Sequence, residues 1–198
     1  MLKELVIKNR SYRGYDPKVR LTKEDLLELV DLTRYTASSV NEQPLRYYIA
    51  WEKEEVEQIL PLTMWAKALK DIQLPHPGKE PAAFIIICQD MNISSNTTRF
   101  QRDVGVVAQT MLLGAVEKGF GGCMIGSFYK PQLKELLNLP EGVEPNLIVA
   151  LGKPAEKVVL TDVGEDGSTK YYRDAEDVHY VPKRSLKELV LEAKGTER

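Results

Sequence analysis

Two arginines with a hydroxyl side chain between them lie near the start of the chain, at Arg10, Ser11 and Arg13. Arginine offers two parallel N–H donors and serine adds a third, so this group suits a phosphate dianion. A second basic pair, Lys183 and Arg184, lies near the other end of the chain. From residue type alone these cations are ordinary solvated surface residues, as arginine in a polar run usually is. A phosphate site therefore requires that the fold bring several of them together.

Two further segments have residue types that suit a flat, partly polar ligand. Residues 38–44, with the sequence SSVNEQP, carry short amide and hydroxyl side chains that can bond a polyol or the edge of a heteroaromatic ring. Residues 121–127, GGCMIGS, contain glycines that let backbone amides approach a ligand closely. Without a ligand, the first segment is a loop that bonds its own backbone, and the second is a tightly packed strand.

The order and spacing of these three segments resemble the nitroreductase-like flavoprotein family, and the resemblance spans most of the chain. It implies an FMN site at the subunit interface of a homodimer, with residues 38–41 reaching the flavin bound mainly by the other subunit. It also implies that a backbone N–H at Gly126 or Ser127 donates to flavin N5. The FMN contacts that the resemblance implies are Arg10, Ser11, Arg13, Ser38, Ser39, Asn41, Gln43, Met124, Ile125, Gly126, Ser127, Lys183 and Arg184.

Two residues depart from the family pattern. Ala37 occupies a position where the family often has proline, and Leu45 one where it often has tryptophan. These differences affect the stiffness of the loop and the wall of the pocket more than cofactor binding. Gln43 could fix the loop instead of contacting the flavin.

The chemistry requires few reacting side chains. No nucleophile is paired with a base and no pair of histidines is apparent, so we expect no catalytic side chain and assign the redox chemistry to the flavin. A cation near flavin N1 and O2 would stabilise negative charge there. Lys67, Lys70 and Arg102 are candidates for that cation, and Trp65 or Phe100 for an aromatic wall of the substrate pocket.

The elements that position these segments follow from hydrophobic periodicity and from turn residues. Thr22 caps an expected helix with a core face over residues 26–32, and Ser185 begins a capping box at the last helix. Further helices are expected over residues 54–60, 102–118 and 131–137, and strands over 47–51, 82–88 and 146–151. This succession indicates an α+β fold, and the resemblance implies a central mixed sheet flanked by helices. We expect one domain over residues 1–198.

Composition excludes several classes of function. The 198 residues include 27 basic and 29 acidic side chains, and a net charge of -2 would attract neither nucleic acid nor an anionic membrane. The chain shows neither a signal peptide nor an apolar run of the ~20 residues that span a bilayer, so we expect a cytoplasmic protein. Cys88 and Cys123 lack the spacing of metal ligands and are expected to be buried thiols.

The sequence therefore favours an FMN-dependent NAD(P)H oxidoreductase with a ping-pong cycle. Its acceptor would be a nitroaromatic, a quinone or a related electron-poor small molecule, and its reductant NADH or NADPH. One alternative is an FMN-binding protein without turnover, such as a sensor or carrier. Another is a same-fold enzyme with a different flavin reaction such as dehalogenation, and a third is a purely structural dimer.

Overall fold

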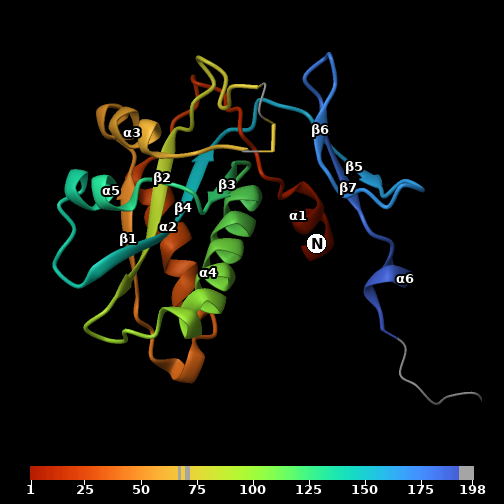
Figure 1. Cartoon of the computed structure of the whole chain (residues 1–198). Helices are drawn as coiled ribbons and strands as arrows, with labels where there is room; N and C mark the ends of the chain where they lie inside the picture. Colours follow the sequence, from red (N-terminus) through yellow and green to blue (C-terminus); the bar gives the residue numbers. More distant parts are fainter. Residues whose placement is uncertain (67, 70–71, 192–198) are drawn as a thin grey trace, which may run out of the picture. The chain divides into compact units, whose positions relative to one another are not determined.

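The computed structural model describes residues 1–66, 68–69 and 72–191, which fall into two compact units. The first unit is Met1–Ala155, and it contains a four-stranded sheet with helices on both faces (Figure 1). The second unit begins at Glu156 and contains a small three-stranded sheet. That residues 1–198 serve as one flavin-binding domain stays a prediction.

The central sheet has the strand order β1-β2-β4-β3, and each neighbouring pair is antiparallel. The strands are β1 (Leu45–Ala50), β2 (Ala83–Asp90), β4 (Val143–Gly152) and β3 (Gly121–Ile125). β2 is buried from Ala83 to Gln89, as its continuous apolar sequence predicts for a strand covered on both faces. The strands β1 and β3 form the two edges of this sheet.

Alternate residues of the central strands serve two cores, because successive side chains of a strand point to opposite faces. Ile85 and Val149 pack in one core with residues of α2 and α4, whereas Ile86 and Ile148 pack in the other with residues of α3 and α5. The helices are α2 (Lys23–Leu32), α4 (Thr97–Glu117), α3 (Lys53–Ile59) and α5 (Lys130–Leu136). Figure 1 shows the sheet between these two pairs.

Helix α4 is the longest helix and begins five residues earlier than its periodicity predicts. Asn96 caps it by accepting a hydrogen bond from the Arg99 N–H at 2.9 Å. A Cβ added at Gly114 would lie 2.5 Å from Leu32 Cδ1, so this glycine permits the close approach of α2 to α4. None of the helices in the described ranges is long and apolar enough to cross a lipid bilayer.

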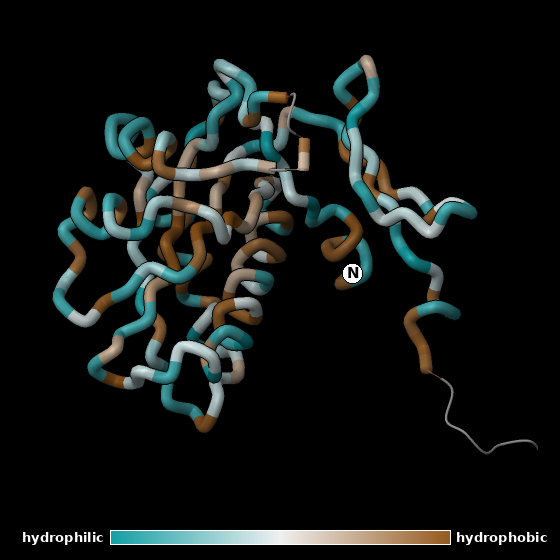
Figure 2. Tube along the Cα trace, in the orientation of Figure 1, coloured by the Kyte–Doolittle hydropathy of each residue, from teal (hydrophilic) through white to brown (hydrophobic). Residues whose placement is uncertain are grey.

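Short elements connect this framework. The 3-10 helices η1 (Thr33–Tyr35), η2 (Ser39–Asn41) and η3 (Leu60–Leu62) lie between α2 and β2. Helix α1 (Leu2–Lys8) contacts α4 but buries none of its own residues. Leu2, Val6 and Ile7 are exposed on it. Figure 2 shows apolar stretches, in brown, along the helix beside the N-terminus.

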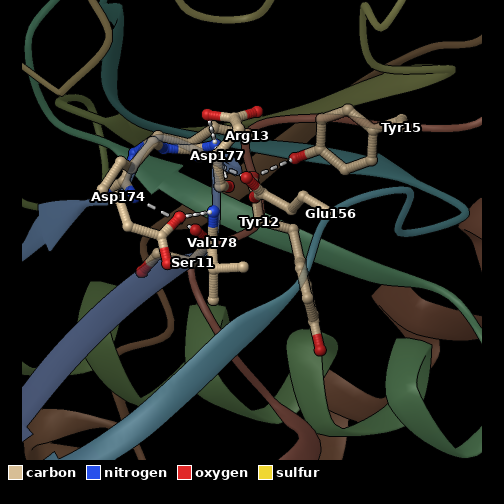
Figure 3. Close-up of polar contacts among 9 residues, drawn as sticks. Ser11, Tyr12, Arg13, Tyr15, Glu156, Asp174, Asp177 and Val178 are labelled. Carbon is tan, nitrogen blue, oxygen red and sulfur yellow. Dashed lines mark hydrogen bonds and ion pairs between the residues drawn. The ribbon is translucent and has the colours of Figure 1, made fainter.

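The second unit pairs β5 (Val158–Asp162) with β7 (His179–Lys183) in parallel, and β6 (Tyr172–Arg173) with β7 in antiparallel fashion. The guanidinium of Arg173 is buried and forms ion pairs with Glu156 and with Asp177. Asp174 accepts a hydrogen bond from the Val178 N–H at 2.8 Å, which closes the turn between β6 and β7 (Figure 3).

The expected capping box at Ser185 is present and opens α6 (Leu186–Leu189). The predicted α+β class is confirmed. The parallel pairing of strands β5 and β7 lies in the small sheet, while the central sheet is antiparallel throughout.

Candidate functional site

The loop that contains Ser38 to Gln43 has an unusual backbone. Val40, Asn41 and Gln43 have positive φ angles of 50°, 54° and 51°. Left-handed conformations are uncommon outside glycine, and a β-branched residue such as valine is a clear outlier there. Strain of this kind costs on the order of 1–3 kcal/mol per residue and persists only where surrounding contacts enforce it.

A buried carboxylate on α4 provides those contacts. Asp103 Oδ2 accepts hydrogen bonds from Ser38 Oγ at 2.7 Å and from the Ser39 N–H at 2.9 Å, and its Oδ1 accepts from Ser39 Oγ at 2.8 Å. Burial alone would raise the pKa of the Asp103 carboxyl, but these hydrogen bonds favour the charged form and the net effect lowers the pKa. Hydrogen bonds to a charged group contribute about 1.5–3 kcal/mol each, enough to offset the backbone strain.

Sequence reasoning missed Asp103, although one signal was present. The residue lies in the expected α4 helix beside Val104 and Val107, which belong to the core. An aspartate on a buried helix face needs hydrogen-bond donors, because an unpaired buried charge is costly. The sequence therefore indicates that Asp103 has donors, but not that they come from a loop more than 60 residues away.

Asn41 and Gln43 are joined within the same loop. Gln43 Nε2 donates to Asn41 Oδ1 at 3.0 Å, and the Gln43 N–H donates to Ser38 Oγ at 3.1 Å. Gln43 thus fixes the loop in this structure, the alternative role considered for it. The Asn41 amide keeps its Nδ2 donors, which have no acceptor among the described residues.

A cavity of about 210 Å³ lies beside the loop. Ala37 and Leu45, the two departures from the family pattern, both line it, and their side chains are smaller than the residues that the family often has there. Burial raises the pKa of the Tyr47 phenol in the same wall, so this hydroxyl stays protonated at neutral pH. The lining also includes Ser38, Asn41, Gln43 and Asp103.

The N-terminal segment runs beside β3 and brings two of the three predicted segments together. Ser11 forms a parallel bridge with Gly122, and the Tyr12 N–H donates to the Gly122 carbonyl at 3.0 Å. The Tyr15 hydroxyl donates to the Tyr12 carbonyl at 2.6 Å and fixes the segment from its other side (Figure 3). Arg10, Ser11 and Arg13 therefore lie next to the glycine-containing strand.

Arg10 is the cation in this segment whose bonding is incomplete. Its Nη2 donates to the Val6 carbonyl at 2.7 Å, but its Nε is buried without a hydrogen-bond partner in the described part of the chain. Burial also lowers its pKa from the ordinary arginine value. An unmet buried donor costs about 1–3 kcal/mol, so an anionic ligand that accepts from Nε would be stabilised here. Arg13 Nη1 donates to the Ser11 carbonyl at 3.1 Å.

Beyond Gly122, no strand of the described residues pairs with the outer edge of β3. Backbone groups of alternate residues face the same edge, so Met124 directs its N–H away from β4, as Gly122 does. The same alternation continued to Gly126 favours that residue over Ser127 as the donor to a ligand. Both Met124 and Gly126 are exposed. Ile125, by contrast, is buried in the core that contains α5 and offers no side chain to the ligand.

The glycines of residues 121–127 have different structural roles. A Cβ at Gly122 would lie 2.2 Å from the Ala150 carbonyl oxygen, and one at Gly121 would lie 2.6 Å from Tyr12 Cδ2. At Gly126 the nearest atom is Leu147 Cδ1 at 3.9 Å. Packing within the chain therefore requires the first two glycines, whereas Gly126 has room for an added methyl group.

The remaining predicted residues lie in several places. Ser127 accepts a hydrogen bond from the Met64 N–H at 3.0 Å, which places the segment before Trp65 beside this strand. Phe100 is fully buried, so its ring does not form a pocket wall. Arg102 is exposed on α4. Lys67 and Lys70 lie outside the described residues.

Lys183 and Arg184 belong to the second unit. Lys183 ends β7 and is exposed, and Arg184 Nη1 forms an ion pair with Glu188 Oε1 at 3.2 Å. Their participation in the site stays a prediction.

The sequence and the fold are both similar to those of known proteins. Residues 6–153 match the model of the nitroreductase family. The chain is 24% identical over 185 residues to "Putative NAD(P)H nitroreductase YdgI" of Bacillus subtilis (strain 168), covering 78% of this chain and 88% of that protein. A nitroreductase-like protein from Streptococcus mutans has a TM-score of 0.66 at 18% identity, over 78% of this chain and 88% of that one.

An FMN-dependent nitroreductase from Clostridium difficile R20291 has a TM-score of 0.63 at 20% identity, over 77% of this chain and 87% of that one. At such identities these solved structures show a shared fold. The family model covers most of the chain, including the N-terminal segment, the loop at residues 38–43 and β3. The chain belongs to the nitroreductase family.

Proposed function

We propose that this protein is an FMN-dependent oxidoreductase that takes reducing equivalents from NADH or NADPH and delivers them to an electron-poor small molecule, such as a nitroaromatic or a quinone. Family membership supports an oxidoreductase, and the names of its relatives refer to NAD(P)H and FMN. The observation that carries the cofactor assignment is the buried Nε of Arg10, which has no partner among the described residues and belongs to the residue before Ser11, whose backbone bridges to Gly122 of β3.

Each segment has a role in this proposal. Arg10, Ser11 and Arg13 bind the phosphate end of the cofactor, with Lys183 and Arg184 as further cations. The strand from Met124 to Ser127 lies against the ring, and a backbone N–H at Gly126 donates to it. When bound, FMN would supply the redox chemistry of a ping-pong cycle, and the protein would position it.

We further propose a homodimer in which residues 38–43 complete the partner's site. Leu2, Val6 and Ile7 on α1 are exposed, and so is Val106 on α4, the helix that α1 contacts. Exposed apolar side chains on two contacting helices favour burial against another surface. A second copy of the chain is the occupant that the site itself needs, because the loop would then face a cofactor bound by the other subunit.

The first test is the visible spectrum of the purified protein with added FMN, followed by anaerobic addition of NADH or NADPH. We expect oxidised-flavin bands that bleach with a nucleotide and return when a nitroaromatic or quinone is added. Bound flavin that never bleaches with either nucleotide would instead favour a carrier or sensor. Absence of FMN binding would overturn the cofactor assignment.

A further inference from the structure

We propose that Asp103 is a positioning residue that holds the loop at residues 38–43, with Ser38 and Ser39 as its anchors and Asn41 as the donor that the loop presents to a ligand. That Asp103 holds the loop follows from contacts within the chain. That Asn41 donates to a ligand rests on the proposed FMN function. The resemblance predicts instead that both serines contact the cofactor directly.

The serine hydroxyls have no hydrogen left for a ligand. Each hydroxyl carries one O–H donor, and those of Ser38 and Ser39 go to the two oxygens of Asp103 at 2.7 and 2.8 Å. Ser38 Oγ also accepts from the Gln43 N–H, so it is bonded on both sides. A phosphate or a flavin carbonyl needs donors, and in this conformation the serine side chains supply none.

The backbone of the loop depends on the same carboxylate. Val40 is exposed to 76% and lacks the packing that could enforce its left-handed φ of 50°. Two internal hydrogen bonds close the turn, from the Asn41 N–H to the Ser38 carbonyl and from the Glu42 N–H to the Ser39 carbonyl. Ser38 and Ser39 accept these two hydrogen bonds, and Asp103 binds both of them. The carboxylate therefore fixes the two residues on which the turn closes.

Asn41 is the side chain that this arrangement directs to a ligand. Gln43 Nε2 donates to its Oδ1 at 3.0 Å, which orients the amide and leaves the Nδ2 donors available. Asn41 is exposed and lines the cavity of about 210 Å³ together with Asp103. The ligand group that it suits is an acceptor, such as a ring carbonyl, a polyol oxygen or a phosphate oxygen.

The test compares Asp103→Ala and Asp103→Asn in the full-length protein, with Asp25→Ala as the matched control. Asp25 makes the same type of contact at the start of α2, where Thr22 donates to it through its N–H and its hydroxyl. Hydrogen exchange without FMN reports on the amides of residues 41–43, and a titration with FMN gives the dissociation constant.

For Asp103→Ala we expect exchange of these amides to be faster by about tenfold or more and FMN binding to be weaker by a similar factor. Asp103→Asn restores both to within about threefold, because one amide oxygen can replace Oδ2 as the acceptor for Ser38 and Ser39. Asp25→Ala changes neither the loop exchange nor the FMN affinity. If Asp103→Ala does not fold, Ser39→Ala takes its place, since it removes one of the three bonds.

A further variant distinguishes a residue that positions the loop from one that contacts FMN directly. Asn41→Asp keeps the Oδ1 that accepts from Gln43 and suits the left-handed backbone, but it removes the Nδ2 donors. It should weaken FMN binding while exchange at residues 42 and 43 stays as in the wild type. Unchanged exchange in Asp103→Ala would overturn the proposal. So would Ser38→Ala and Ser39→Ala variants that lose FMN affinity with unchanged exchange, because the serines would then be direct contacts. If the wild type itself binds no FMN, the proposed function fails, and the exchange experiment still decides whether Asp103 holds the loop.

Discussion

At the scale of single residues, the binding site is defined by polar groups whose hydrogen bonds are either complete or incomplete. Ser38 and Ser39 are saturated by Asp103, whereas the Nε of Arg10 has no partner in the described part of the chain. A polar group whose hydrogen bonds are complete within the chain stabilises the fold, whereas a buried donor without an acceptor indicates a ligand site. Residue type does not distinguish these cases, since all of these side chains can bind a phosphate.

Arg10→Ala should weaken FMN binding by about 10- to 100-fold, because a charge-assisted hydrogen bond of roughly 1.5–3 kcal/mol is lost. The folded state should lose little stability, since the variant also removes a buried donor without a partner. Fluorescence titration of FMN measures the effect. Lys53→Ala, which removes an exposed cation paired with Glu57, is the control and should bind as the wild type does. Equal affinities for Arg10→Ala and the control would contradict the phosphate assignment.

The stabilising effect of Asp103 should depend on pH. Its pKa is lower in the folded protein than in the unfolded chain, where it is about 3.9, so its contribution is complete above about pH 5. The contribution is lost as the pH falls through the lowered pKa, because folded and unfolded states then both bind the proton.

Denaturant unfolding of wild type and Asp103→Asn at several pH values measures this contribution. We expect the difference in unfolding free energy to be largest near neutral pH and to shrink in acid. A constant difference would contradict the assignment.

At the scale of elements, the glycines of β3 separate a packing role from a binding role. Gly122→Ala should destabilise the fold by about 1–3 kcal/mol or prevent folding, because its Cβ would lie 2.2 Å from a backbone oxygen of β4. Gly126→Ala should leave stability within about 0.5 kcal/mol, since the site has room for a methyl group. The same methyl group would narrow the space proposed for the flavin and weaken FMN binding.

Thermal unfolding and FMN titration of both glycine variants, compared in parallel, distinguish the packing role from the binding role. A Gly126→Ala variant with normal FMN affinity would exclude this glycine from the ring site.

Elements set by local sequence were predictable, and those set by distant contacts were not. The apolar run of β2, the helix cap at Thr22 and the capping box at Ser185 were visible because their signals lie within a few residues. The start of α4 was missed because the Asn96 cap precedes its apolar periodicity by several residues. The hydrogen bond from Ser38 to Asp103 joins residues far apart in sequence, and no local sequence pattern predicts such a bond.

The same reasoning applies to the candidate site. Residue types and order indicated all three segments in the first unit, and the structure brings the N-terminal segment and β3 together. The division near Ala155 was not predicted, because residues 162–177 are rich in charged residues and glycine and give no hydrophobic strand pattern. In the structure, β6 lies inside that stretch and pairs with β7.

At the scale of the whole molecule, dimerisation and cofactor binding should be linked. If α1 lies in the dimer interface, Val6→Glu places a charge in an apolar contact and should favour the monomer. The monomer would also bind FMN more weakly, because each site lacks the partner's loop at residues 38–43. Leu136→Glu is a suitable control, since this exposed leucine lies on α5, on the opposite face of the central sheet from α4.

Sedimentation analysis with and without FMN tests this linkage. A ligand that binds only the dimer stabilises it by mass action, by about 2.7 kcal/mol per site at a free concentration 100 times its dissociation constant. Added FMN should therefore return Val6→Glu toward the dimer, and the apparent FMN affinity should rise with protein concentration. The control variant should stay dimeric and bind FMN as the wild type does. A monomeric Val6→Glu protein with unchanged FMN affinity would mean that each chain forms a complete site by itself, and the loop at residues 38–43 would then serve the cofactor of its own chain.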